Sequence, residues 1–292
     1  MNRRTFLATT SLSGLATAAT AHALAQASNS APAPAEFPRK GRLNQSVCRW
    51  CYGSIPLPEF AKTARKLGLK SIELLNPEEW PVIAAEGLTC AVGAGLRSNP
   101  IPKGLNRETH HDAIAAEMLP RLEACAKAGV PQQIVFSGNR EGLSDSDGLA
   151  ACAKGLKLLT PTAERLGVTI VMELLNSKVD HGDYQCDRTP WGADLVQAVG
   201  SDRFKLLYDI YHMQIMEGDV IRTIRTHKDA IGHYHTAGNP GRNEIDLSQE
   251  LNYKAICEAI VETGFTGYLA QEFIPKRDPL TSLRESIEIC DV

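Results

Sequence analysis

The sequence predicts an α/β fold, a single (β/α)8 barrel, and three observations lead to this prediction. From Leu43 onward, short apolar runs alternate with segments of helical periodicity, as expected for the strand–helix units of a parallel sheet. Eight such pairs follow one another without a long polar linker. No G-x-G-x-x-G pattern follows the first run, which disfavours an open, doubly wound sheet. The barrel is therefore expected to occupy residues 43–292, close to the roughly 250 residues that this fold usually needs.

Each unit begins with a short apolar run and continues with a segment whose apolar residues recur at helical spacing. The expected strands are Gln45–Trp50, Ser71–Leu75, Leu88–Val92, Gln132–Ser137, Thr169–Leu174, Phe204–Tyr208, Gly232–Thr236 and Tyr268–Phe273. The expected helices are Leu57–Leu67, Pro77–Glu86, Arg107–Ala128, Ser146–Leu166, Trp191–Val199, Asp219–Thr226, Tyr253–Thr263 and Leu280–Ile289. Glycine follows several of these helices directly, as at Gly129 and Gly167, where it can adopt the left-handed conformation that ends a helix.

Charge and the length of the apolar stretches disfavour two classes of protein, those that bind nucleic acid and those anchored in a membrane. The chain is 43% apolar and 22% charged, which is typical of a globular protein with a full core. Its formal net charge of −3 disfavours a nucleic-acid partner, because such proteins usually carry a basic surplus. Outside the N-terminus, no apolar stretch reaches the length of a membrane span. We therefore expect neither a nucleic-acid partner nor a membrane anchor in the mature protein.

The N-terminal residues have the pattern of an export signal. Arg3 and Arg4 precede a weakly hydrophobic stretch rich in Ala, Thr and Ser that runs to about Leu24, and small residues such as Ala23 and Ala25 offer a cleavage site. We expect a twin-arginine-type signal peptide at residues 1–27, a flexible spacer at 28–42, and a periplasmic or otherwise exported protein. An ordinary secretory signal with a chance arginine pair is the alternative.

The eight cysteines do not have the spacing of a disulfide framework. Four of them lie on the apolar faces of expected helices, where cysteine acts as a small hydrophobic residue: Cys125, Cys152, Cys257 and Cys290. Cys48 and Cys51 form a single C-x-x-C pattern on an expected strand, where residues three apart point to opposite faces. A redox or zinc role for this pair is therefore not favoured.

A glutamate, an aspartate, a histidine and a second glutamate stand at the ends of four successive expected strands: Glu173, Asp209, His235 and Glu272. Active sites of barrels lie at this end of the strands. Any one of these residues could be salt-bridged or hydrogen-bonded in the core, but three carboxylates brought together repel one another unless a cation compensates them. We therefore predict one divalent metal ion held by these four. Mn²⁺ or Mg²⁺ suits such a ligand set better than Co²⁺ or Zn²⁺, which remain alternatives.

The sequence around these residues resembles the xylose-isomerase-like TIM-barrel superfamily and, within it, the hydroxypyruvate isomerase family most. The resemblance lies in Met172-Glu-Leu-Leu-Asn176, Tyr208-Asp-Ile-Tyr-His-Met-Gln214, Gly232-His-Tyr-His-Thr236, Asn239-Pro-Gly-Arg242 and Gln271-Glu-Phe-Ile-Pro275. It implies that Glu173, Asp209, His235 and Glu272 are metal ligands, and that Glu173 and Glu272 are also the catalytic acid–base pair. It covers the chain from about Gln45 to the C-terminus.

Two positions point to different substrates. Hydroxypyruvate isomerases often have glutamine where this chain has His235, whereas the sugar epimerases of the superfamily have histidine. Those epimerases also carry a second glutamate that holds the sugar, and Val179 occupies its position here, as in the hydroxypyruvate isomerases.

The resemblance implies a metal-dependent aldose–ketose-type isomerase that converts hydroxypyruvate to 2-hydroxy-3-oxopropanoate (tartronate semialdehyde) through an enediolate. Arg242 is the expected partner of the substrate carboxylate, because a guanidinium group pairs with it through two hydrogen bonds; a salt bridge to Glu244 or Glu173 is the alternative. We expect His212 either to bind a substrate or ligand oxygen or to orient Asp209. Asn106 and Arg107, in a loop after the third strand, could add substrate contacts.

Two other functions remain open. A periplasmic epimerase, isomerase or lyase acting on a free or oxidised sugar would fit export better than hydroxypyruvate does. A non-catalytic sugar-binding barrel is disfavoured because both acid–base glutamates are present. A metal-dependent endonuclease would need more histidine and aspartate ligands and a basic groove. The expected partner is thus a small hydroxy-carbonyl or sugar molecule, and the resemblance is compatible with a homo-oligomer.

Overall fold

A computed structural model describes residues 39–292. The predicted signal peptide and most of the predicted spacer lie outside these residues. The strands are β1 (Asn44–Cys48), β2 (Ser71–Glu73), β3 (Val92–Gly93), β4 (Gln132–Val135), β5 (Thr169–Glu173), β6 (Phe204–Asp209), β7 (Ile231–Thr236) and β8 (Tyr268–Gln271). They form one sheet in the order β2-β1-β8-β7-β6-β5-β4-β3, and neighbouring strands run parallel.

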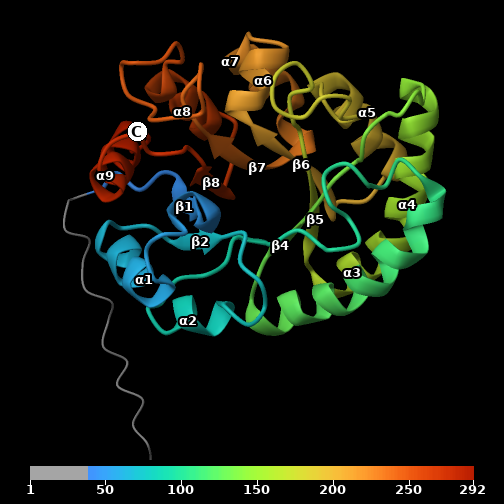
Figure 1. Ribbon diagram of the computed structural model, residues 1–292, viewed down its shortest axis with the longest axis horizontal. Helices are drawn as coiled ribbons and strands as arrows, with labels where there is room; N and C mark the ends of the chain where they lie inside the picture. The colour runs from blue at the N-terminus through green and yellow to red at the C-terminus, as the bar shows by residue number, and fades with distance from the viewer. Residues whose placement is uncertain (1–38) are drawn as a thin grey trace, which may run out of the picture. The chain divides into compact units, whose positions relative to one another are not determined.

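The sheet curves until its two outer strands meet. Single backbone bridges join Ser71 to Thr89 and Leu75 to Gly93, between the β2 and β3 segments. Figure 1 shows the ring of strands with β1 beside β8, so that the first and last parts of the barrel lie side by side. The predicted (β/α)8 barrel is confirmed.

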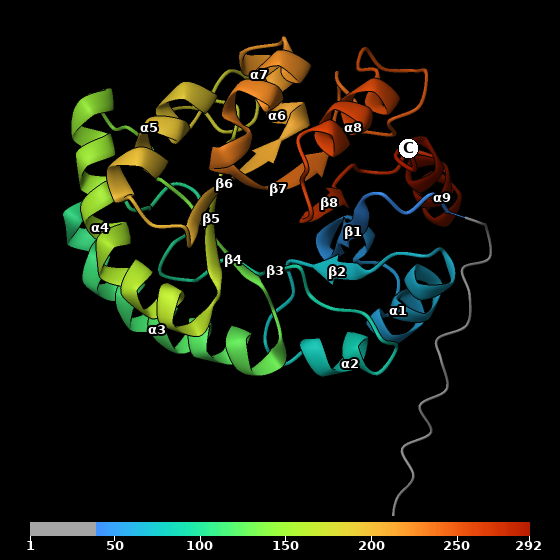
Figure 2. The same cartoon turned by 180° about the vertical axis from the view of Figure 1, so that it is seen from behind.

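Helices surround the ring of strands on the outside (Figures 1 and 2). They are α1 (Leu57–Lys66), α2 (Trp80–Ala84), α3 (Glu108–Ala128), α4 (Asp145–Leu166), α5 (Thr189–Val199), α6 (Ile210–Met216), α7 (Val220–His227), α8 (Tyr253–Glu262) and α9 (Pro279–Ile289), with 3₁₀ turns η1 (Arg49–Tyr52) and η2 (Lys228–Ala230). Gly129 and Gly167 end α3 and α4 with φ of 71°, as their positions in the sequence predicted.

Several bounds differ from the sequence-based expectation, and the third strand, expected at Leu88–Val92, is β3 at Val92–Gly93. Two further differences concern the segments that follow β1 and β6. Trp50 was expected on the first strand but lies in η1, because the Arg49 guanidinium donates hydrogen bonds to the carbonyl oxygens of Tyr52 and Ile55 and curls the chain out of the sheet. The short helix α6 was not expected. It begins directly after β6, where the Asp209 side chain accepts a hydrogen bond from the backbone N–H of His212 and caps the helix.

The interior of the barrel is divided between apolar and polar side chains. Ala91, Val92, Ile134, Val171 and Leu207 form a small buried cluster within the ring, separate from the main core between strands and helices. The strands β2 and β7 instead contribute three fully buried polar residues, Glu73, His233 and His235. Buried ionisable side chains therefore enter the barrel from β2 and β7.

All eight cysteines lie within the described residues and none forms a disulfide bond. Cys125, Cys152, Cys257 and Cys290 are fully buried, which confirms the prediction that they pack as small hydrophobic residues. Among residues 39–292, no helix combines the length and apolarity needed to cross a bilayer.

Candidate active site

The four predicted metal-ligating residues meet at the carboxyl end of the barrel. Glu173, Asp209 and His235 lie at the ends of β5, β6 and β7, and Glu272 directly follows β8. Each offers one ligand atom, and these atoms all lie within 4.8 Å of one another. All four side chains are buried, with exposed fractions of 5% or less. Neighbouring parallel strands bring them together because their carboxyl ends share one edge of the sheet.

Glu272 is the most heavily bonded of the three carboxylates. Its Oε2 atom lies 2.9 Å from His235 Nδ1 and accepts a hydrogen bond from Arg242 Nη2 at 2.8 Å, while its Oε1 atom accepts one from Trp50 Nε1 at 2.8 Å. Burial alone would raise the pKa of Glu272, but His235, Arg242 and Trp50 hold it well below its usual range. Glu272 is therefore ionised at neutral pH.

Glu173 and Asp209 are less well compensated. Glu173 Oε1 and Asp209 Oδ2 are buried and accept no hydrogen bond within the described residues. Burial and the nearby charge of Glu272 raise the pKa of Asp209 to about 8, and burial is also the main cause of the raised pKa of Glu173. Buried carboxylate oxygens without partners are costly, so a further positive group is needed at this point.

The side chains present fit a divalent cation. A metal with bonds of about 2.0–2.2 Å to oxygen and nitrogen keeps its ligand atoms within about 4.4 Å of one another, so small side-chain movements suffice to surround it. The two unpaired oxygens, of Glu173 and Asp209, would gain a partner. When all three are ionised, the carboxylates carry more negative charge than Arg242 and a protonated His235 together balance. The site is therefore a candidate metal site by geometry and by charge.

Arg242 is held over this cluster by two aromatic rings. Its guanidinium carbon lies 5.2 Å from the centre of the Trp50 ring and 5.6 Å from that of Tyr211. Arg242 Nη2 contacts Glu272, and lies 3.8 Å from Asp209 Oδ2. The alternative salt bridges considered from the sequence, to Glu244 or Glu173, are not the pairs formed. Arg242 Nε is buried without a hydrogen-bond partner among the described residues and remains available as a donor.

The predicted position of His212 beside Asp209 is also observed. His212 is fully buried, and Asn176 Nδ2 donates a hydrogen bond to its Nδ1 atom at 2.6 Å. Its proton is therefore assigned to Nε2, which has no hydrogen-bond partner in the described part of the chain and lies 3.9 Å from Asp209 Oδ2. Burial and the charge of Arg242 lower the pKa of His212 well below its usual value. His212 is thus a neutral donor beside the cluster.

A cavity of about 290 Å³ opens over these residues. Glu173, Glu272, Arg242, His181 and Trp50 form its polar side and rim, and apolar residues form the rest: Leu74, Ala94, Gly95, Ile101, Ile134, Phe136 and Leu175. Its size suits a small molecule rather than a polymer.

The chain resembles known proteins in sequence and in fold. Residues 52–291 match the model of one family, described as the xylose isomerase-like TIM barrel. The chain belongs to this family. A 2-oxo-tetronate isomerase of Cupriavidus necator is 29% identical over 75% of this chain and 87% of that protein. A putative hydroxypyruvate isomerase of Xenopus laevis is 32% identical over 76% and 77%, and the hydroxypyruvate isomerase of Escherichia coli is 25% identical over 78% and 91%.

The similarity to these relatives identifies the chain as an isomerase, as the sequence predicted. Solved structures of the same fold include a 3-keto-D-glucoside 4-epimerase of Escherichia coli, with a TM-score of 0.71, 21% identity, and coverage of 84% of this chain and 98% of that one. A D-psicose 3-epimerase of Clostridium cellulolyticum has a TM-score of 0.71 at 17% identity, with coverage of 86% and 100%. At these identities the likeness establishes the barrel alone.

Two residues that were predicted to contact the substrate do not line the cavity. Asn106 is buried in the loop before α3, where its Nδ2 atom donates hydrogen bonds to the carbonyl oxygen of Asn139 and to Gln185 Oε1. Arg107 donates to the backbone oxygens of Asn106 and Arg140. Neither side chain lines the cavity. Their geometry supports a role in holding the loops rather than in binding substrate.

Two buried residues that were not predicted from the sequence, Glu73 and His233, lie with His235 on the barrel side of the site. Glu73 Oε1 lies 2.9 Å from Nε2 of each histidine. Burial raises the pKa of Glu73, but His233 and His235 together lower it to about 2. The signal was available: Glu73 is a charged residue within an apolar strand, like Glu173, and His233 precedes His235 by the two residues that place both on one face of a strand.

The loop that carries Arg242 depends on a glycine. Gly238 donates to the carbonyl oxygen of Asn243 and accepts from the N–H of Arg242, and a Cβ atom added to it would lie 2.2 Å from the carbonyl oxygen of Glu244. Gly238→Ala should therefore displace Arg242 and lower kcat/KM for isomerisation by about a hundredfold, the order of loss that a misplaced active-site group can cause.

Gly182→Ala is the matched control, because it also lies in a loop at this end of the barrel and has open space around an added Cβ atom. The two variants are compared with wild type by steady-state kinetics and by thermal unfolding. Equal activity of Gly238→Ala and wild type would contradict the role of the loop.

Proposed function

We propose that this isomerase is metal-dependent and moves a proton between adjacent carbons of a short 2-oxo acid bearing a hydroxyl group next to its carbonyl. Hydroxypyruvate, converted to 2-hydroxy-3-oxopropanoate, is the first candidate. The observation that carries the proposal is the convergence of Glu173, Asp209, His235 and Glu272 on one buried point, where two carboxylate oxygens have no hydrogen-bond partner among residues 39–292.

Glu173, Asp209, His235 and Glu272 would hold the divalent ion, with Mn²⁺ or Mg²⁺ favoured by the predominance of oxygen ligands. When bound, such an ion polarises a substrate carbonyl and stabilises the negative charge that develops on its oxygen. Glu173 and Glu272 both line the cavity, so either carboxylate can reach a substrate placed in it.

The two glutamates supply the proton transfers. One carboxylate removes a proton from C3 of hydroxypyruvate, and the electron pair of that C–H bond forms a C2–C3 double bond while the carbonyl electrons move to the C2 oxygen. The other carboxylate, in its acid form, returns a proton to C2. The C3 hydroxyl proton is transferred to the C2 oxygen, which leaves an aldehyde at C3 and a hydroxyl group at C2. Mass and charge are unchanged overall.

Arg242 and His212 would bind and orient the substrate. The unpaired Nε of Arg242 and the unpaired Nε2 of His212 are buried donors beside the cluster. The guanidinium group suits the substrate carboxylate, and the neutral imidazole suits a hydroxyl or carbonyl oxygen. The aromatic rings of Trp50 and Tyr211 limit the movement of Arg242, so less conformational entropy is lost when a carboxylate binds.

The apolar wall of the cavity supports a short acid over a sugar. A longer polyol would place its distal hydroxyl groups against Leu74, Ile134 and Phe136, which offer no hydrogen bonds. Val179, at the position where the sugar epimerases of the family hold their substrate, is 70% exposed and apolar. The 2-oxo-tetronate named for one relative is a four-carbon acid, so it is the second compound to test.

Glu173→Gln and Glu272→Gln should each reduce turnover of hydroxypyruvate by about 10²–10⁴-fold, because each removes one proton-transfer group. The reaction is followed by NMR in D₂O, where deuterium appears at C2 of the product. Glu258→Gln, on the exposed face of α8, is the control and should match wild type. Exchange of deuterium into a keto-hexose but not into either acid would contradict the proposed substrate class.

Metal affinity should rise with pH. Burial lowers the pKa of His235, but its contacts with Cys48 and Glu272 raise it well above the usual value, and the pKa of Asp209 is about 8. Protons on these groups must leave when the metal binds, so protonation at lower pH competes with binding. Calorimetric titration with Mn²⁺ should show affinity increasing by about tenfold per pH unit for each proton released. An affinity that is constant or falls as the pH is raised toward 8 would contradict the ligand set.

We also propose that residues 1–27 direct export by the twin-arginine route, on the basis of Arg3, Arg4 and the stretch that follows them. In a bacterial host, the full-length wild-type chain should reach the periplasmic fraction, and the double variant Arg3→Lys, Arg4→Lys should remain in the cytoplasm. An ordinary secretory signal tolerates this exchange, so continued export of the double variant would rule out the twin-arginine route.

A further inference from the structure

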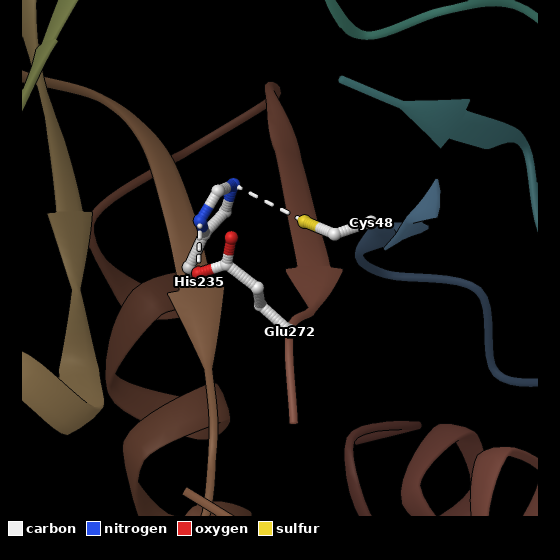
Figure 3. A group of neighbouring side chains, drawn as sticks. All are labelled: Cys48, His235 and Glu272. Atoms are coloured by element: carbon white, nitrogen blue, oxygen red, sulfur yellow. Dashed lines mark hydrogen bonds and ion pairs between the residues drawn. The ribbon is translucent and has the colours of Figure 1, made fainter. Parts of the chain in front are cut away.

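The ring of His235 is held between two acidic groups on opposite sides. Its Nδ1 atom faces Glu272 Oε2 at 2.9 Å and Glu173 Oε1 at 3.6 Å. Its Nε2 atom faces the barrel interior, where Glu73 Oε1 lies at 2.9 Å and Cys48 Sγ at 3.7 Å. Figure 3 shows the imidazole ring between Glu272 and Cys48, with one nitrogen directed to each.

The contact with Glu73 is the stronger of the two on the interior side. A carboxylate that accepts an N–H bond at 2.9 Å forms a charge-assisted hydrogen bond, whereas a thiol at 3.7 Å is a weak partner. The Glu73 side chain is fully buried, so water does not compete for its hydrogen bonds. Its Oε1 atom also lies 2.9 Å from Nε2 of His233, so a second imidazole fixes the carboxylate in place.

This arrangement determines which nitrogen of His235 keeps its proton when a metal binds. A neutral imidazole has one N–H group, and an ionised carboxylate can only accept. Glu272 is itself a proposed ligand, so a bound cation would take the place of a proton on Nδ1. The remaining proton then stays on Nε2, directed at Glu73. The lone pair of Nδ1 is then directed at the point where Glu173, Asp209 and Glu272 converge, which is the form needed in a metal ligand.

We propose that Glu73 is a positioning residue for metal binding: it holds His235 in the Nε2–H tautomer and fixes its ring so that Nδ1 faces the other three ligands. Glu73 and its partner His233 both lie on strands, β2 and β7, so the support is part of the rigid barrel. The inference rests on the proposed metal site, and it adds a residue from outside the four predicted ligands.

Glu73→Gln tests the positioning role directly. Glutamine keeps the size of the side chain but is neutral, so it cannot form charge-assisted hydrogen bonds with the two histidines. The Mn²⁺ dissociation constant, measured by calorimetry, should rise about 10–100-fold, the usual loss when a group that orients a metal-binding histidine is removed. Cys48→Ala is the matched control. It removes the other group near Nε2 but leaves Glu73 in place, so it should not raise the Mn²⁺ dissociation constant.

A second measurement uses the wild-type protein, so it remains informative if Glu73→Gln does not fold. In Zn²⁺-loaded protein labelled with ¹⁵N-histidine, the ¹⁵N shifts of His235 should show a metal-bound Nδ1 and a protonated Nε2, with its resonance assigned by its loss in His235→Gln. A metal-bound Nε2 would overturn the inference. So would unchanged Mn²⁺ affinity in folded Glu73→Gln, or a second metal ion bound per chain with Glu73 as a ligand.

These outcomes separate the inference from the proposed function. If wild type binds no divalent ion, the proposed metal site fails and the inference fails with it. If wild type binds one ion and Glu73→Gln binds it equally well, only the role of Glu73 is wrong.

Discussion

Three buried carboxylates at one point of the barrel are the constraint on which the rest of the site depends. Glu173, Asp209 and Glu272 would repel one another, and burial removes the water that could screen them. Much of the surrounding structure supplies positive charge or hydrogen-bond donors to this cluster. Arg242 and Trp50 reach Glu272, a backbone N–H reaches Asp209, and His235 lies between Glu272 and Glu73. Even so, two carboxylate oxygens have no hydrogen-bond partner in the part of the chain that the structure describes, and a divalent ion would satisfy both.

The barrel positions this cluster with parts that differ in rigidity. Ligand atoms come from the ends of strands, whose positions are fixed by the sheet and by the apolar residues within it. Arg242 comes from a loop, and its position depends on Gly238 and on contacts with the rings of Trp50 and Tyr211. The division suits the chemistry proposed, because metal ligands need fixed geometry whereas a carboxylate-binding group must let substrate enter and product leave.

The sequence predicted the barrel, the four strand-end residues and the nearness of His212 and Arg242, because each follows a local rule. Apolar periodicity indicates strands and helices, and a charged residue at a strand end of a barrel indicates the site. Trp50 was misplaced because the hydrogen bonds of Arg49 that curl η1 are not visible in a hydrophobic pattern. Asn106 and Arg107 were expected at the substrate because their loop follows a strand, but side-chain direction within a loop depends on tertiary contacts. Glu73 was overlooked because its partners, His233 and His235, lie 160 and 162 residues away in the chain.

Whether activity requires the metal is the most direct test of this account. The divalent metal content of the purified protein is measured by elemental analysis, and isomerisation of hydroxypyruvate is followed before chelation, after chelation and after readdition of Mn²⁺ or Mg²⁺. The account predicts close to one ion per chain, loss of turnover when the ion is removed, and recovery when it is restored. Full turnover in protein shown to contain no divalent ion would contradict it.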